Sequence, residues 1–340
     1  MKQQHFHVKF LKGYGFSISV KDSKIILKNC YDPFSKPEIE EWFVKDMPYQ
    51  RIILQGKGYI STESLSLLSE NNRTVVLLDN RGKQVTLCHG IRDSLTATKY
   101  RMAQYDTFRD KSKRDYLIQQ IIKVKIQSQI KFLKSTNHHE ILQNINKLEK
   151  SGISEAVSSR YYFDNYTKLI DVRFGFKKRN SVRIEKKNAT DVINALLNYG
   201  YAVLAGQIST YLNGVGLDAY YGFMHKNHTS FQSLVYDMME PFRWLVDYSV
   251  WKLSDAKSRN RISKKQYAYT RDGIVVLEYD LIRKFLELLE RTFQKERKYA
   301  YRHGAFTKDG LKSVQEITIA KIMVQNLAEF CIGKQKEFRI

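Results

Sequence analysis

The first ninety residues alternate between apolar and polar side chains with the two-residue period of β-strands. The alternation over residues 16–27 is broken by a Lys-Asp-Ser turn, which predicts a β-hairpin. The apolar run RIILQ at 51–55 predicts a buried strand, and TVVLLDNRGKQVTL at 74–87 predicts a second hairpin around its Asp-Asn-Arg-Gly turn. We therefore predict a β-rich domain over residues 1–90.

Beyond this point the apolar residues recur every three to four positions, so we predict an α-helical domain over residues 91–340. A long helix is predicted at 115–134. Its isoleucines and valine alternate with three lysines, which are Lys123, Lys125 and Lys131. Such a pattern is typical of an amphipathic helix, so we expect its basic face to be solvated. The fold class is α+β.

Two strongly apolar helices are predicted at 189–212 and 230–253. Gly214 and Gly216 end the first helix, because glycine adopts the left-handed cap conformation without steric cost. The Gly-rich connection that follows leads to His225, with His228 three residues later, just before the second helix.

Asp237 and Glu240 lie three residues apart on the second helix, so their carboxylates share one face. Two acids among apolar neighbours are costly to bury unless a positive group lies between them. His225 could complete such a site, although a lone histidine beside a core is more often only a hydrogen-bonded structural residue.

Three linked motifs resemble the CRISPR-associated integrase, the metal-dependent DNA endonuclease of spacer acquisition. They are NALLNYGYAVL at 194–204, GLDAYYGFMH at 216–225 and LVYDMMEPFRWLVD at 234–247. The resemblance covers essentially the whole chain. Ala219 and Trp244 stand where the family usually has proline, and neither is a ligand position.

The resemblance implies that residues 1–90 form a dimerisation domain and residues 91–340 a metal-dependent catalytic domain. It also implies a homodimer and a small ferredoxin-like partner protein from the same adaptation system. The implied substrates are double-stranded DNA with 3′-hydroxyl ends and the repeat DNA of a CRISPR array.

The resemblance further implies that Glu155, His225 and Glu240 are metal ligands and catalytic residues. Asp237 is either an alternate ligand or a neighbour that orients one. Glu155 has a structural interpretation as well, because an acid in the first turn of a helix is favoured by the helix dipole. Carboxylates with one imidazole and no thiol favour Mg²⁺ or Mn²⁺ over a structural zinc.

A divalent ion at such a site suits phosphodiester chemistry, since it stabilises the attacking and leaving oxygens. The same site can cut DNA with water or join it with a 3′-hydroxyl. The resemblance implies the joining reaction, in which 3′ ends of a captured fragment attack the repeat boundaries.

The net charge of +22, from 57 Lys and Arg against 35 Asp and Glu, favours a polyanionic partner. Nucleic acid is the first expectation and an acidic membrane surface the second. Cys30, Cys88 and Cys331 form neither a disulfide framework nor a zinc spacing, which fits a reducing cytoplasm. No stretch approaches the about 20 apolar residues of a membrane span, so we expect no membrane association.

Basic segments at 171–187, 252–271 and 297–304, the last with interleaved tyrosines, suit contacts with the DNA backbone and base stacking, although each alone is more often a solvated loop. Arg243 either pairs with a ligand carboxylate or contacts a phosphate. The DNA-contact candidates are Arg179, Arg183, Lys186, Lys187, Arg243, Lys257, Arg259 and Arg261.

Two alternatives remain open. Asp171, Glu185 and Lys187 form a spacing like that of restriction-type nucleases, in which two acids bind metal and a lysine assists the attacking water. Alternatively, the chain is a basic DNA-binding scaffold without catalysis, and its acids form structural ion pairs.

Overall fold

The computed structural model describes residues 8–29, 36–78, 84–88, 95–141, 155–180, 188–225, 231–255, 258, 261–300 and 311–340. The chain divides into two compact units. The first comprises residues 1–93 together with 278–282, and the second comprises residues 94–277 and 283–340. Residues named in the sequence analysis that fall between these ranges, including Cys30, lie outside the described residues.

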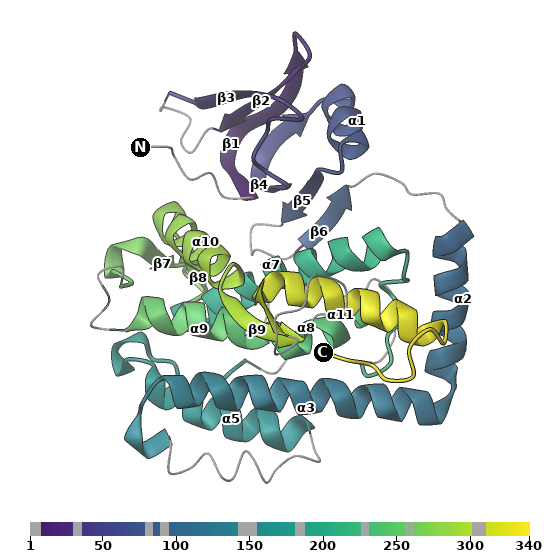
Figure 1. Ribbon diagram of the computed structural model, residues 1–340. Helices are drawn as coiled ribbons and strands as arrows, with labels where there is room; N and C mark the ends of the chain where they lie inside the picture. The colour runs from purple at the N-terminus through teal and green to yellow at the C-terminus, as the bar shows by residue number, and fades with distance from the viewer. Residues whose placement is uncertain are drawn as a thin grey trace. The chain divides into compact units, whose positions relative to one another are not determined.

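The first unit is built on a six-stranded mixed sheet with the strand order β3-β2-β1-β4-β5-β6 (Figure 1). Strand β1 pairs parallel with β4, and β4 pairs parallel with β5; the remaining pairs are antiparallel. The strands are β1 (Val8–Lys21), β2 (Lys24–Asn29), β3 (Glu38–Phe43), β4 (Arg51–Ile60), β5 (Thr74–Leu78) and β6 (Gln84–Cys88).

One helix, α1 (Thr62–Glu70), connects the parallel strands β4 and β5, as such a crossover requires. Its first turn is capped by Ser61, whose hydroxyl accepts a hydrogen bond from the Ser64 N–H at 3.2 Å. Leu68 is fully buried in the core of this unit. Both predicted hairpins are confirmed as the antiparallel pairs β1–β2 and β5–β6.

The second unit is mostly helical. Its helices are α2 (Leu95–Arg109), α3 (Lys111–Ser135), α5 (Glu155–Leu169), α7 (Val192–Val215), α8 (Ser233–Met239), α9 (Arg243–Ser254), α10 (Tyr279–Phe293, whose first residues group with the first unit) and α11 (Glu316–Cys331). Its short helical turns and two small hairpins are η1 (Val172–Phe174), η2 (Glu240–Phe242), η3 (Lys264–Gln266), β7 (Tyr267–Tyr269) with β8 (Val275–Leu277), and β9 (Glu296–Ala300) with β10 (Leu311–Gln315). The predicted α+β fold class, with a β-rich first part and a helical second part, is confirmed.

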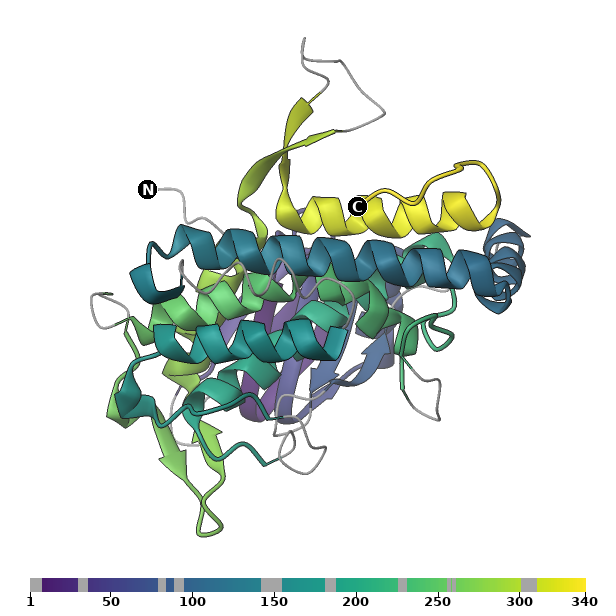
Figure 2. The ribbon, with the colours of Figure 1, turned by 90° about the horizontal axis from the view of Figure 1, so that it is seen from below.

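Helix α7 lies at the centre of this unit and is buried on most of its surface, as its apolar sequence predicts. Asp191 caps its start by accepting a hydrogen bond from the Asn194 N–H, and Gly216 ends it in the left-handed conformation. Helices α8, α9 and α11 pack against α7, and α3 runs beside α5 (Figure 2). This packing fixes the elements that carry the site.

The single helix predicted over residues 230–253 is wrong. The structure has α8, the 3₁₀ turn η2 and α9 in its place. Pro241 lies in η2, and a proline has no N–H to donate and clashes with the preceding turn. The break places Asp237 and Glu240 on two different elements.

Candidate active site

Glu155 begins the described part of α5. Its Oε1 accepts hydrogen bonds from the Lys125 ammonium of α3 at 2.5 Å and from the Ser159 hydroxyl at 3.0 Å. The Glu155 side chain is 42% exposed. One edge of this carboxylate therefore remains open to solvent.

Glu240 lies in η2 with its side chain only 2% exposed. The Arg243 guanidinium donates to Glu240 Oε1 at 2.8 Å, and Lys125 Nζ lies 2.7 Å from Oε2. Oε2 nevertheless has no well-aligned hydrogen-bond donor among the described residues. The structure thus brings Glu155 and Glu240 together around a single ammonium group.

The expectation that the basic face of helix 115–134 is solvated is wrong for Lys125, whose side chain is only 4% exposed. The sequence does carry a signal for this. Ile121, Lys125 and Gln129 lie at successive four-residue intervals on one face of α3, and all three are buried. A lysine on the apolar face needs a buried acid, which here is Glu240.

Both glutamates are ionised at neutral pH. Burial by itself would raise the pKa of Glu240, but the charges of Arg243 and Lys125 outweigh it and lower the pKa to about 2. The pKa of Glu155 is also lowered. Burial is the largest single influence and opposes this shift, but the charge and hydrogen bond of Lys125 together with the Ser159 hydrogen bond outweigh it.

His225 is held by Asp237, which is completely buried on α8. Asp237 Oδ1 lies 2.6 Å from His225 Nδ1 and accepts the His225 backbone N–H at 2.9 Å. Its Oδ2 accepts the N–H groups of Phe223 at 2.7 Å and Met224 at 3.0 Å. Both carboxylate oxygens of Asp237 are therefore occupied by hydrogen bonds. This geometry favours a role for Asp237 in orienting the His225 ring, with the lone pair of the imidazole on Nε2.

Gly222 allows this close approach of loop and helix. A Cβ atom at this position would lie 2.6 Å from Asp237 Oδ2 and 2.8 Å from the Ser233 carbonyl carbon. The Gly222 N–H donates to the Ser233 hydroxyl at 2.9 Å. A glycine is thus required at position 222 because the loop packs against the start of α8.

Within the described ranges, no three His, Cys, Asp or Glu side chains are grouped closely enough to hold a metal ion. The predicted site residues instead form two pairs, Glu155 with Glu240 and His225 with Asp237. The helix α8 and the turn η2 that follows it link the pairs, because Asp237 and Glu240 lie on these successive elements.

A buried tyrosine–carboxylate network adjoins the glutamate pair and was not found from the sequence. The Arg243 guanidinium stacks 4.2 Å from the Tyr201 ring centroid. The hydroxyls of Tyr201 and Tyr162 both donate to the Asp247 carboxylate, the latter at 2.7 Å. Asp247 is fully buried, and burial raises its pKa although both tyrosine hydrogen bonds and the nearby arginines oppose this. The network of Tyr162, Tyr201 and Asp247 joins α5, α7 and α9.

Of the predicted DNA contacts, Arg179 points inward. Its guanidinium donates to the side-chain oxygens of Asn194 and Asn198, both at 2.7 Å, and burial lowers its pKa. Arg243 is paired with Glu240 and 24% exposed, whereas Arg261 is exposed. The remaining candidates lie outside the described residues: Arg183, Lys186, Lys187, Lys257 and Arg259.

The restriction-type alternative is only partly visible. The Asp171 carboxylate caps η1 by accepting the Arg173 N–H at 3.0 Å, and it also lies 3.4 Å from the Arg173 side chain. Glu185 and Lys187 lie outside the described residues.

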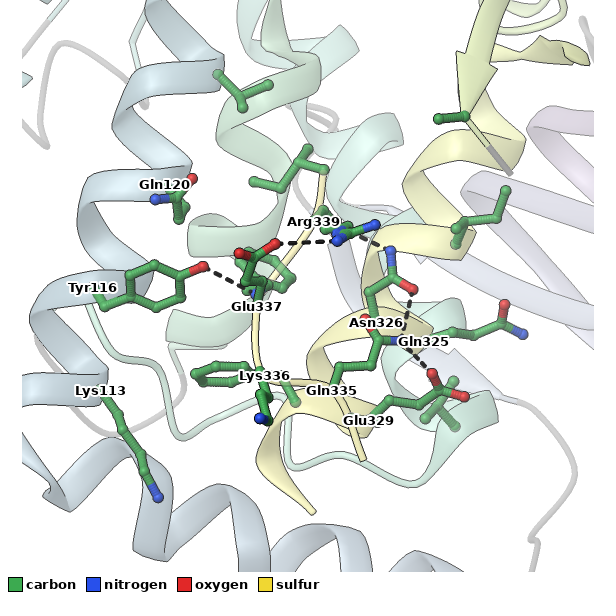
Figure 3. A pocket seen from close by; sticks show the side chains of 18 of the residues that line it. Lys113, Tyr116, Gln120, Gln325, Asn326, Glu329, Gln335, Lys336, Glu337 and Arg339 are labelled. Carbon is green, nitrogen blue, oxygen red and sulfur yellow. Dashed lines mark hydrogen bonds and ion pairs between the residues drawn. The ribbon is translucent and has the colours of Figure 1, made fainter. Parts of the chain in front are cut away.

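A separate pocket of about 1430 Å³ lies against α3 and α11 (Figure 3). The C-terminal tail crosses it, and the Phe338 N–H donates to the Tyr116 hydroxyl at 3.1 Å. Arg339 pairs with Glu337 in the same pocket. None of the predicted catalytic residues lines it.

The fold is shared with solved structures. The chain superposes on a structure described as a casposase bound to integration product with a TM-score of 0.82 at 24% identity, covering 97% of this chain and 92% of that one. It also superposes on a chain of a Cas6-RT-Cas1–Cas2 complex with a TM-score of 0.74 at 18% identity, covering 100% of this chain and 36% of that one. These likenesses show a shared fold.

The family follows from the sequence match. Residues 10–291 match the family described as CRISPR associated protein Cas1, so the chain belongs to the Cas1 family. One relative, CRISPR-associated endonuclease Cas1 1 of Archaeoglobus fulgidus, is 26% identical in an alignment of 290 residues that covers 74% of this chain and 81% of the relative. The family resemblance of the three motifs is thereby confirmed.

Proposed function

We propose that the protein is a divalent-metal-dependent DNA endonuclease and integrase that inserts captured DNA fragments into a CRISPR array. The observation that carries the proposal is the pair of ionised carboxylates, Glu155 and Glu240, contributed by distant parts of the chain and facing one cation. Family membership supports the same reaction.

The two glutamates have the donor chemistry that Mg²⁺ or Mn²⁺ requires, although the described residues hold no preformed group of three ligands. Glu155 and Glu240 supply hard carboxylate oxygens, one of which, Glu240 Oε2, has no aligned donor among the described residues. An ion bound there would gain a third ligand if His225 moved toward the glutamates, because its Nε2 would supply a nitrogen lone pair that Mn²⁺ also accepts. The bound ion would neutralise charge on the phosphate during displacement.

The other residues of the site act on these groups. Arg243 fixes the orientation of the Glu240 carboxylate, and Asp237 fixes the His225 ring. The nucleophile is the 3′-hydroxyl of a captured duplex in the joining reaction, and water in the cutting reaction.

We further propose that the protein acts in the cytoplasm as a homodimer joined through residues 1–90, together with a small ferredoxin-like partner protein. The match to a chain of a complex that contains Cas2 supports such a partner. Among the described residues, no helix has the length and apolar character needed to span a membrane. The net charge of +22 supports DNA as the substrate.

An integration assay tests the proposal. It combines a short duplex with 3′-hydroxyl ends, a supercoiled plasmid with a CRISPR repeat, the partner protein and Mn²⁺. We expect the wild type to join the duplex to the plasmid, and His225→Ala and Glu155→Ala each to lose most of the product. Glu185→Ala serves as the control and should remain active.

Two results would contradict the proposal. Loss of activity in Glu185→Ala with full activity in His225→Ala would favour the restriction-type site. DNA binding without nicking or joining in Mn²⁺, and without a metal-dependent rise in melting temperature, would favour the scaffold.

A further inference from the structure

Lys125 occupies the centre of the glutamate pair. Its ammonium lies 2.5 Å from Glu155 Oε1, 2.7 Å from Glu240 Oε2 and 3.2 Å from the Ser159 hydroxyl. A side chain 4% exposed on the apolar face of α3 is fixed by packing, so this position is set by the helix and not by a flexible surface loop.

We propose that Lys125 is a positioning residue whose ammonium holds Glu155 and Glu240 together in the free protein, and that a divalent cation binds there by displacing it. The inference rests on the proposed function, since it concerns the same carboxylates. It goes beyond that function by predicting that metal binding and DNA binding are coupled.

The coupling follows from the charges. The two ionised glutamates are balanced by Lys125 and Arg243, so the cluster is neutral as the structure shows it. A divalent ion added to this cluster creates two uncompensated positive charges beside the buried Glu240, which is unfavourable in a medium of low dielectric. Phosphate groups of DNA supply the missing negative charge. Each ligand therefore strengthens the binding of the other.

The exposure of the three side chains shows where the ammonium can go. Lys125 and Glu240 are buried, whereas Glu155 is 42% exposed, so the cluster opens to solvent on the Glu155 side. Ser159, one turn after Glu155 on α5, already accepts a hydrogen bond from Lys125. A displaced ammonium can keep this hydrogen bond and turn toward the face by which a phosphate enters.

Mn²⁺ titration of the full chain, followed by loss of the electron paramagnetic resonance signal of free Mn²⁺, tests the proposal. It is done with and without a short duplex whose 3′ ends lack hydroxyls, so that no joining occurs. The variants are Lys125→Met, which keeps the length of the side chain but removes its charge, and Lys123→Met. Lys123 is an exposed lysine of the same helix and provides the matched control.

We expect the wild type to bind Mn²⁺ more tightly with DNA than without it. Without DNA, Lys125→Met should bind Mn²⁺ about tenfold more tightly than the wild type or more, because a repelling charge a few ångströms away is removed. The increase in Mn²⁺ affinity that DNA produces should be smaller in Lys125→Met than in the wild type. Lys123→Met should behave like the wild type.

If the wild type binds Mn²⁺ and Lys125→Met binds it equally well or more weakly, this inference is overturned. The proposed function is left standing by that result. No Mn²⁺ binding by the wild type, with or without DNA, would instead overturn the proposed function. If circular dichroism shows that Lys125→Met is unfolded, Lys125→Arg carries the test. The arginine guanidinium can bond both carboxylates and should be harder to displace than the ammonium, so Lys125→Arg should bind Mn²⁺ more weakly than the wild type. Binding as tight as that of the wild type, or tighter, would overturn the inference.

Discussion

At the scale of single residues, the site depends on charges that are buried but paired. Glu240 is almost inaccessible, yet it remains ionised because two cations, Arg243 and Lys125, face it. Removing one partner of a buried pair typically costs about 3–5 kcal/mol, because it leaves an uncompensated charge. The same pairing keeps the carboxylate in the form that a metal ion requires.

The pKa of Glu240 leads to a prediction about acid stability. Its folded value of about 2 is below the ordinary value of 4.5, so its stabilising contribution is complete above about pH 4.5 and is lost as the pH falls toward 2. This contribution is on the order of 3 kcal/mol. We expect Glu240→Gln to be less stable than the wild type at pH 7, and the difference to shrink toward pH 2.

Urea unfolding of both proteins in the presence of a chelator, at several pH values from 7 to the lowest at which both fold, measures this difference. Glu287→Gln, at an exposed ion pair of α10, is the control and should change little. A constant difference between wild type and Glu240→Gln across the range would show that Glu240 is not held ionised by its neighbours.

The sequence identified part of this residue-scale picture and missed the rest for physical reasons. Glu155, His225 and Glu240 came from motif resemblance, and nothing in local spacing shows that Glu155 approaches Glu240. The three-residue spacing of Asp237 and Glu240 left their roles open, because it places both acids on one face of an ideal helix. Pro241 follows both acids and ends α8, so that Asp237 lies in α8 and Glu240 begins η2, and this helix end was readable from the proline.

At the scale of elements, α7 is the central support, and its close contacts depend on a small residue. A Cβ atom added at Gly200 would lie 2.7 Å from Phe285 Cζ of α10 and closer still to Val246 Cγ1 of α9. Gly214, in the last turn of the same helix, has open space at the equivalent position. The two glycines therefore have different roles in one helix.

We expect Gly200→Ala and Gly214→Ala to change stability in opposite directions. Alanine favours a helix over glycine by up to about 1 kcal/mol, so Gly214→Ala should be neutral or stabilising. At Gly200 the cost of overpacking, about 1–3 kcal/mol, exceeds this gain. Urea denaturation midpoints of both variants measure the effect. A stabilised Gly200→Ala would show that α9 and α10 can move away from α7.

The secondary-structure elements were more predictable from the sequence than the site or the strand order. The change of apolar period near residue 90 distinguished strands from helices, and the helix predicted at 115–134 lies within α3. The strand order β3-β2-β1-β4-β5-β6 was not predictable, because alternation gives each strand a buried face but no neighbour.

At the scale of the whole molecule, the net charge of +22 favours DNA, but the structure distinguishes arginines that can contact it from arginines that support the fold. The two terminal nitrogens of Arg179 donate to Asn194 and Asn198, whereas Arg261 is exposed. The charge total alone treats the two as equal.

We expect DNA affinity to fall as salt rises, with a slope of about −0.9 in logarithmic units for each phosphate neutralised. Arg261→Gln should reduce the size of this slope by about one unit. Arg179→Gln should leave it unchanged and instead lower the melting temperature. Fluorescence anisotropy at several salt concentrations measures both slopes. An equal loss of slope in the two variants would contradict the inward role of Arg179.

The tyrosine network around Asp247 has a consequence for engineering this protein. One carboxylate receives hydroxyls from α5 and α7 and sits on α9, so three helices are locked in register two turns from Glu155. The spacing between α5, which carries Glu155, and α9, which follows Glu240, is therefore held by groups that are themselves buried. We expect surface loops to tolerate exchange as long as Tyr162, Tyr201 and Asp247 keep these three helices aligned.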